Sequence, residues 1–285
     1  MAADIRIGTC AWSYDDWRGT FYPEHLASNQ WLAFYARRFA AVEIDSTFYG
    51  VPKPHVLGHW LDETPPEFSF TCKLSREITH ERHLRDCGEL MDEFLRGIAP
   101  LHSRLGCVLA QLPASFTPAK HEAGLRAFVA DLPRDFRFAF EFRNAEWHLP
   151  RIVRLLEEHG VCWVWNDLTS VEEQNRAAFE FLPQTTDFLY LRLMGDFATR
   201  HNSDGNRAHH YKTLLWPRTS SLESWAMKIK KHSAEAAPIF AFLSNHFEGH
   251  APLSAKRLAS RLGIEIDLPD PGGEDSGGGS QMKLL

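Results

Sequence analysis

The sequence predicts a single (β/α)8 barrel of the TIM type, an α/β fold with parallel strands. Eight short apolar segments alternate with eight segments of helical periodicity, and strict alternation is typical of a parallel sheet. Most apolar segments are continuous, as expected of strands that are buried on both faces. No segment is followed by a dinucleotide-binding glycine motif or a P-loop, which argues against the alternative of an open doubly wound sheet.

Each predicted strand is an apolar run that ends at turn-forming residues. Pro113 follows one run directly, and the STFYG turn ends another at Asp45. The stretch 136–147 alternates phenylalanines with small or charged residues, which places Glu141 and Arg143 on one face. The predicted strands cover residues 5–10, 41–45, 68–73, 105–112, 136–147, 161–167, 187–194 and 239–245.

Helical periodicity fills the intervals between the strands. The helix at 150–159 has Pro150 at its start and Gly160 just past its end, the usual asymmetry of helix termini. An amphipathic run begins at Ser28, whose side chain can cap it. Long loops are expected after residue 73 and over 195–219. The predicted helices cover residues 28–39, 53–63, 87–103, 118–130, 150–159, 171–178, 221–236 and 252–262.

Composition limits the class of protein. A chain of 285 residues, 44% of them hydrophobic, can bury one large core, and we expect a single domain over 1–268. Residues 269–285 are rich in glycine and serine, so a disordered tail is expected there. The net charge of −6 with interspersed charges argues against a nucleic-acid binder, which usually carries a basic stripe.

The chain lacks the features of an exported or membrane protein. No apolar run reaches the length of a membrane span, and the N-terminal MAADIRIG has no signal-peptide pattern. The five cysteines are odd in number and never form a CxxC pair, as expected of reduced core thiols. We therefore expect a cytoplasmic protein without membrane contact.

Polar residues gather where the predicted strands end. Reactive groups of such barrels lie at the C-terminal ends of the strands, so these side chains should share one mouth. Mutual pairing of the charges is the structural alternative, and a cleft for a ligand is the functional one. The residues are Thr9, Trp12, Glu43, Asp45, Lys73, Gln111, Glu141, Arg143, Asn166, Asp167, Arg192 and Asn245.

The residue types indicate a small polar or anionic ligand. Lys73, Arg143 and Arg192 would hold it, since an arginine fork suits a carboxylate or a phosphate. Glu141, with Glu43 or Asp45, would transfer protons. A two-carboxylate glycosidase is compatible with this set, but its carboxyl separation cannot be derived from a sequence. Further binding residues are Gln111, Asn245 and Asp167, and the aromatic residues that could wall the cleft are Trp12, Tyr49, Trp147 and Trp165.

No metal site is predicted, and the sequence leaves the cofactor unknown. The histidine pairs at 80/83, 209/210 and 246/250 match neither HExxH nor a zinc-finger spacing. Binding of a divalent ion by Glu43, Asp45 and Glu141 remains an open alternative. A Ser/His/Asp nucleophile lacks a GxSxG motif, and Cys10 and Cys72 fit buried thiols better than nucleophiles.

At these residues the sequence resembles the YecE-like family, a domain of unknown function (number seventy-two). The resemblance runs from Ile5 to Leu262 and implies a TIM-like barrel, but it implies no particular reaction. His80, in the ITH motif, joins the residues expected to bind substrate. The shared motifs are GT at 8–9 with Trp12 and Tyr14, WRGTFYP at 17–23, VEIDSTFY at 42–49, ITH at 78–80, QLP at 111–113, EFR at 141–143 with Trp147, and RL at 192–193.

The sequence also departs from the pattern of that family. Asp45 stands where the family usually has asparagine, and Met194 stands where it tends to have histidine. Leu243 and Ser244 replace the first two residues of the usual FNN, so that only Asn245 is kept. The resemblance then implies either a different substrate or a lost activity for this member.

Three functions follow from these observations. The first is an enzyme, a hydrolase or another acid–base catalyst, that acts on a small polar or anionic substrate. The second is a non-catalytic binding protein for a phosphorylated or carboxylated metabolite, which would tolerate loss of Glu141. The third is a barrel acting on nucleic acid, and the acidic net charge argues against it.

Overall fold

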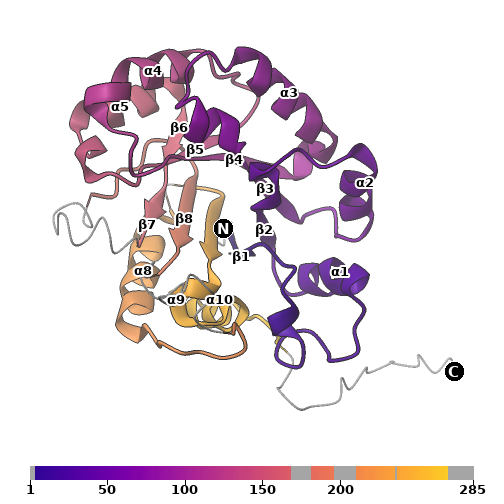
Figure 1. Ribbon diagram of the computed structural model, residues 1–285. Coiled ribbons are helices and arrows are strands. Elements are labelled where there is room, and N and C mark those ends of the chain that lie inside the picture. Colours follow the sequence, from indigo (N-terminus) through magenta and orange to yellow (C-terminus); the bar gives the residue numbers. More distant parts are fainter. Residues whose placement is uncertain (1–3, 168–180, 196–209, 235, 269–285) are drawn as a thin grey trace, which may run out of the picture.

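The computed structural model describes residues 4–167, 181–195, 210–234 and 236–268. In these ranges nine parallel strands form one sheet in the order β6-β5-β4-β3-β2-β1-β9-β8-β7. Figure 1 shows the strands around the centre of the molecule, with the helices outside them. The predicted TIM-like barrel of parallel strands is therefore confirmed.

The strands are short and their C-terminal ends face one mouth of the barrel. Parallel pairing aligns these ends, so the residues that follow each strand meet there. The bounds are β1 Ile5–Cys10, β2 Ala41–Ile44, β3 Ser69–Lys73, β4 Leu105–Gln111, β5 Phe138–Glu141, β6 Val161–Trp163, β7 Trp165–Asn166, β8 Leu189–Leu193 and β9 Ile239–Leu243.

The barrel closes within one predicted strand. In the segment 161–167, β6 pairs with β5 whereas β7 pairs with β8. Val164 lies between the two halves, and its N–H donates to the Phe140 carbonyl at 3.0 Å. The Asp167 N–H donates to the Arg192 carbonyl at 3.4 Å. One segment of chain therefore changes partner along its length, and the nine strands correspond to eight predicted segments.

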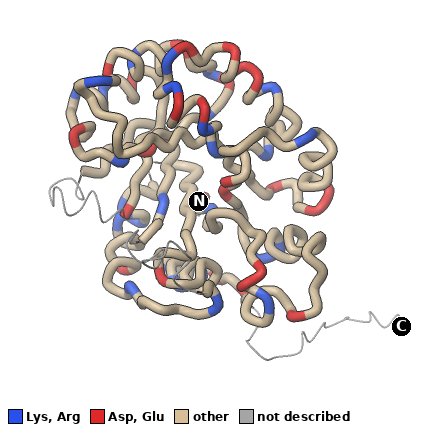
Figure 2. Tube along the Cα trace, in the orientation of Figure 1, with Lys and Arg blue, Asp and Glu red and all other residues tan. Residues whose placement is uncertain are grey.

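Helices cover the outside of the barrel, and Figure 2 shows acidic and basic residues interspersed along them. None of the helices in the described ranges is long and apolar enough to cross a membrane. The α-helices are α1 Trp31–Ala36, α2 Pro54–Asp62, α3 Gly88–Ile98, α4 Pro118–Ala130, α5 Pro150–His159, α8 Thr219–His232, α9 Asn245–Glu248 and α10 Ala251–Leu262.

Several boundaries differ from the prediction for local reasons. The helix predicted at 28–39 begins as a 3₁₀ turn at Ser28–Gln30, whose N-cap is Ala27 and not the expected Ser28. The strand predicted at 136–147 ends at Glu141, because Asn144 accepts the Glu146 N–H at 2.9 Å and starts a 3₁₀ turn. The loop expected after residue 73 contains a π-helical turn, Glu77–Glu81.

Other differences concern the second half of the chain. Asn245, predicted at a strand end, instead begins α9 after β9 has ended at Leu243. Gly160 adopts a left-handed conformation (φ 66°) at the end of α5, as its position in the sequence predicts. The helix predicted at 171–178, most of the loop at 195–219 and the tail at 269–285 lie outside the described residues.

The buried side chains form two layers. Side chains alternate along a strand, so Phe240 and Phe242 face the barrel interior while Ile239 and Leu243 pack under the helices. The interior layer also contains Cys10, Cys107 and Cys162, and all five cysteines are buried and free. The larger outer layer joins the strands to the helices. Most strand residues are thus apolar on both faces away from the C-terminal ends, with Arg6 of β1 and Ser69 and Thr71 of β3 as polar exceptions.

Tyr35 and Gly8 hold the first helix close to the barrel. The Tyr35 hydroxyl receives the Thr9 N–H at 2.8 Å and donates to the Ala41 carbonyl at 3.1 Å, which bridges β1 and β2. A Cβ at Gly8 would lie 2.0 Å from the Ala41 carbonyl oxygen and 3.1 Å from that hydroxyl. This close approach explains why glycine is required at this position.

Gly8→Ala is expected to destabilise the protein by about 1–3 kcal/mol, because the methyl group would push β1 and β2 apart. Gly58→Ala is the matched control, since a Cβ there meets nothing within 4 Å inside α2. That change should stabilise the helix by about 0.5–1 kcal/mol. Urea unfolding of both variants measures the two effects, and equal stability of Gly8→Ala and wild type would contradict the packing described here.

Candidate functional site at the mouth of the barrel

Arg192 lies inside the barrel between two carboxylates. Its Nε and Nη2 donate to Glu43 at 2.9 and 2.7 Å, and its Nη1 donates to Oε2 of Glu141. Arg192 is 1% exposed, and Glu43 and Glu141 are fully buried. A buried charge is tolerated only with good partners, and here a forked cation satisfies two anions at once.

Hydroxyl groups extend this cluster toward the interior. The Tyr190 hydroxyl donates to Oε2 of Glu43 at 2.7 Å and lies 2.9 Å from the Thr71 hydroxyl. Tyr190 and Arg192 share the inner face of β8 because they are two residues apart. The side chain of Glu43 is therefore held by two residues of β8, Tyr190 and Arg192.

Glu141 has a second cationic partner at the rim. Burial would raise its pKa, but Arg192 and Arg143 outweigh this effect and hold the pKa of Glu141 at about 2. The Arg143 Nε donates to Oε1 of Glu141 at 3.2 Å, and the Arg143 side chain is 20% exposed. Glu141 therefore stays ionised over the whole physiological pH range.

A cavity of about 230 Å³ lies above this buried cluster. Arg192 forms part of its lining, whereas Glu43 and Glu141 do not reach it. Three cations, Lys73, Arg143 and Arg192, thus face the cavity. Asp45 is the carboxylate that lines it. The lining residues are Cys10, Tyr14, Asp45, Phe48, Tyr49, Lys73, Gln111, Arg143, Arg192, Met194, Ser244 and His246.

Asp45 and Lys73 form the second charged pair of the mouth. The Lys73 Nζ lies 3.9 Å from Oδ1 of Asp45 and 4.3 Å from the centre of the Phe48 ring. Burial and then the charge of Glu43 raise the pKa of Asp45, while burial lowers the pKa of Lys73. Oδ1 of Asp45 accepts no hydrogen bond from a described residue, although the side chain as a whole is 37% exposed. Among the described residues that line the cavity, Oδ1 of Asp45 is thus the one buried side-chain oxygen or nitrogen without a hydrogen-bond partner.

Residues 6–274 match the model of the family described as "Protein of unknown function DUF72", which covers nearly the whole chain. This chain belongs to the DUF72 family. The resemblance that the motifs indicated is thereby confirmed.

Two relatives of this DUF72 protein are named as UPF0759 proteins. It is 36% identical to the UPF0759 protein YecE of Escherichia coli K12 over 143 residues, about half the length of either chain. It is 24% identical to the UPF0759 protein YunF of Bacillus subtilis over 92% of this chain and 95% of YunF.

Solved structures of the family share the fold. A DUF72 family protein from Thermotoga maritima superposes with a TM-score of 0.72 at 28% identity, over 91% of this chain and 99% of the other. One from Enterococcus faecalis gives 0.72 at 22% identity, over 95% and 100%. Both likenesses concern the barrel itself.

The structure brings many of the predicted site residues of the DUF72 chain together. The predicted residues that line the cavity are Asp45, Tyr49, Lys73, Gln111, Arg143 and Arg192. His80 lies just behind them: its Nε2 is 3.5 Å from the Gln111 amide, and its ring packs edge-on against Phe48. Burial lowers the pKa of His80 to about 4, with smaller contributions from Lys73 and Arg143.

Other predicted residues have structural partners away from the cavity. Trp147 is buried, stacks on Phe116 and donates to the Phe116 carbonyl at 2.6 Å. Trp12 packs edge-on against Trp60. Trp165, the fourth of the predicted wall residues, donates to the Pro183 carbonyl at 2.9 Å. None of the three tryptophans lines the cavity.

Asp167 and Asn245 hold neighbouring segments of the chain in place. The Asp167 carboxylate accepts the N–H groups of Met194 and Gly195, and burial still raises its pKa to about 6. Asn245 accepts the Trp17 indole N–H at 3.1 Å and the Ala251 N–H at 2.9 Å. Both side chains therefore position the segments around the mouth instead of facing the cavity.

Sequence reasoning did not single out several lining residues. Tyr14 and Phe48 lie in loops just past β1 and β2, and His246 follows Asn245. Their position after a strand end was the available signal, but their residue types suit a core equally well. Asp45, Met194 and Ser244, where the sequence departs from the family pattern, all line the cavity.

In the described part of the chain, no group of three or more His, Cys, Asp or Glu side chains is arranged to hold a metal ion. Arg192 already lies between Glu43 and Glu141, the two carboxylates that a divalent ion would have to share.

The low pKa of Glu141 predicts a loss of stability in acid. Its folded pKa of about 2 lies below the ordinary 4.5, so its ionised form stabilises the fold fully above pH 4.5 and progressively less toward pH 2. Glu141→Gln should be less stable than wild type at neutral pH, because Arg192 and Arg143 each lose a partner. The difference in the free energy of unfolding between wild type and Glu141→Gln, called the gap below, should narrow between pH 4.5 and 2.

Urea unfolding at a series of pH values measures this gap. Between pH 6 and 8 Glu141 is ionised in both the folded and the unfolded protein, so the gap should stay constant there and serve as the internal control. Parallel stability curves down to pH 2 would contradict the pairing described here.

Proposed function

We propose that the mouth of the barrel binds a small anion and carries out acid–base chemistry on it. The layering of charge supports this proposal: Lys73, Arg143 and Arg192 face the cavity, whereas Glu43 and Glu141 lie beneath Arg192. An anion entering the cavity meets the cations first, at distances at which charge interactions in a partly dry site are strong.

In this proposal Asp45 and Lys73 transfer protons. Their pKa values are shifted toward each other by burial, and such paired shifts are typical of catalytic groups. Asp45 is the base, because it is the carboxylate that lines the cavity and its side chain is 37% exposed. Lys73 binds the anionic group and returns a proton to the product.

Glu43 and Glu141 take a positioning role here, in place of the proton transfer that the sequence suggested for them. Both carboxylates are fully buried and already bound to Arg192. A glycosidase needs two carboxyl groups that reach the substrate from either side, and these two do not line the cavity. A carboxylate whose pKa is about 2 is also a weak base at neutral pH.

A thermal-shift screen tests the binding step. Acetate, inorganic phosphate, sugar phosphates and organic acids are compared on wild type, Arg143→Ala and Arg151→Ala. Arg151 is the control because it pairs with Glu122 on the outer surface. A ligand at a hundred times its Kd stabilises the folded state by about 2.7 kcal/mol, which is a measurable rise in melting temperature.

The rise should survive in Arg151→Ala and disappear in Arg143→Ala. A ligand that stabilises wild type and Arg143→Ala equally would place binding elsewhere and overturn the proposal. Asp45→Asn separates an enzyme from a binding protein: it should keep or strengthen anion binding, since one negative charge is removed, and abolish turnover of the identified ligand.

The pH dependence of binding tests Lys73. A lysine holds an anion only while protonated, and burial lowers the pKa of Lys73 below the ordinary 10.5. Affinity for the anion found in the screen should therefore fall as the pH rises through that lowered value. Lys73→Arg should keep its affinity at the same pH, because arginine stays charged. Titration calorimetry between pH 7 and 10 measures this, and identical profiles for the two proteins would exclude the role of Lys73.

A further inference from the structure

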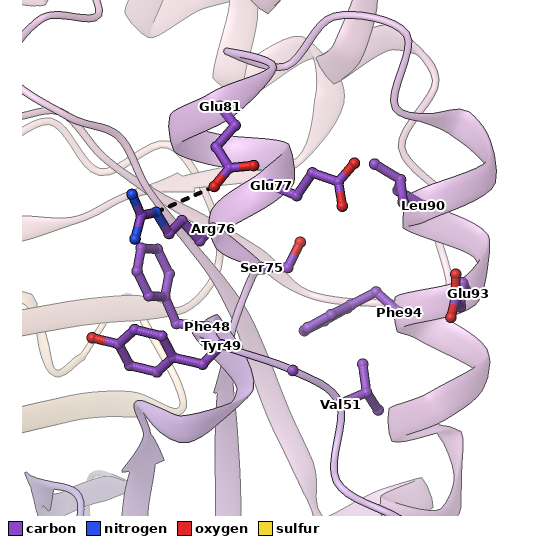
Figure 3. A pocket seen from close by; sticks show the side chains of 11 residues that line it. Phe48, Tyr49, Val51, Ser75, Arg76, Glu77, Glu81, Leu90, Glu93 and Phe94 are labelled. Atoms are coloured by element: carbon purple, nitrogen blue, oxygen red, sulfur yellow. Dashed lines mark ion pairs between the residues drawn. The ribbon is translucent and has the colours of Figure 1, made fainter.

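A second hollow of about 370 Å³ adjoins the mouth of the barrel. It lies between the residues after β2, the π-helical turn Glu77–Glu81 and α3. Figure 3 shows the side chains of Leu90 and Phe94 pointing from α3 toward Ser75 and Glu77, with Phe48 and Tyr49 on the opposite side. Together with Val51, these side chains form the apolar part of a lining that also contains charged residues.

The two hollows share Phe48 and Tyr49. The Tyr49 ring packs edge-on against Phe48, and the Tyr49 side chain is 80% exposed. Thr47 fixes the turn that carries both rings, since its hydroxyl lies 2.9 Å from the Ile44 carbonyl and 2.7 Å from the Lys73 carbonyl. A ligand that extends out of the mouth past this turn would therefore pass over the exposed Tyr49 ring.

The two hollows have opposite formal charge. Three cations and one carboxylate line the mouth cavity, whereas one cation, Arg76, and three carboxylates line the second hollow. Glu81 pairs with Arg76 at 3.4 Å, and Glu77 pairs with Arg82 at 2.9 Å. Glu93 forms no ion pair with any residue in the described ranges, so its charge is not offset locally.

We infer that the second hollow holds the far end of the ligand whose anionic group binds in the mouth, and that this far end is a cation on an apolar spacer. The inference rests on the proposed anion site and adds the class of ligand, an ω-amino acid anion. The spacer would lie against Phe48, Tyr49 and Phe94, and the ammonium group would lie among Glu77, Glu81 and Glu93. Aromatic faces and carboxylates both attract an ammonium group.

A matched set of carboxylates tests the inference by titration calorimetry. Acetate fills the mouth alone, caproate adds an apolar chain, ε-aminocaproate adds a terminal cation and adipate adds a terminal anion. The expected order of affinity is ε-aminocaproate, caproate, acetate and then adipate. The terminal ammonium should gain about fivefold to tenfold over caproate, from one cation beside aromatic and acidic groups.

Variants then locate the gain. Glu77→Gln combined with Glu93→Gln should remove the advantage of ε-aminocaproate over caproate and leave the affinity for acetate unchanged. Leu90→Trp should block the alkyl chain of the ligand, so that all four carboxylates bind with the affinity of acetate. Glu89→Gln is the control, because Glu89 lies on α3 outside the hollow.

The outcomes separate the two proposals. If all four carboxylates bind equally to the wild type, or if adipate binds as tightly as ε-aminocaproate, the second hollow is not part of the site and the inference fails, while the anion site stands. If none of them binds and the wider screen of anions finds no ligand either, the anion site itself fails. A gain for ε-aminocaproate that persists in the double variant also overturns the inference.

Discussion

The ion cluster of Arg192 with Glu43 and Glu141 is the interaction on which the mouth of the barrel depends. It joins β8 to β2 and β5, which are not neighbours in the sheet, across the interior of the barrel. Removing Arg192 would leave two buried carboxylates without their main partner, a change that costs about 3–5 kcal/mol when a single buried pair is broken. The cluster therefore determines which groups remain available above it. Because it uses two of the three carboxylates, Asp45 is left facing the cavity.

Charge and shape divide the rim into two regions around Phe48 and Tyr49. On one side the cations of the mouth lie above the buried cluster, and on the other the acidic residues of the π-helical turn and α3 surround an apolar hollow. Both regions depend on the loops that follow β2 and β3. The Thr47 hydroxyl donates to the Lys73 carbonyl and thereby ties the loop after β2 to the end of β3. Of the four positions at which the sequence departs from the expected family pattern, Asp45, Met194 and Ser244 line the mouth, whereas Leu243 is buried in the outer layer of the core.

The candidate site was predictable where position along a strand decides the outcome. Asp45, Lys73, Arg143 and Arg192 follow from counting to the ends of buried strands, because parallel strands bring those ends together. Trp12 and Trp147, whose rings suit a core and a ligand wall equally well, do not line the cavity. The prediction failed to divide the carboxylates into buried and accessible ones, because that division depends on which of them Arg192 reaches.

The sequence by itself determined the (β/α)8 barrel, the alternation of its strands and helices and the end of the barrel that carries the charges. These follow from local periodicity and from residue types that end strands. Only the tertiary structure decided where the barrel closes, how Glu43, Glu141 and Arg192 pair, and that Phe48 and Tyr49 separate two hollows. These features depend on side chains that are far apart in the chain, and their distances are set by packing rather than by any local pattern.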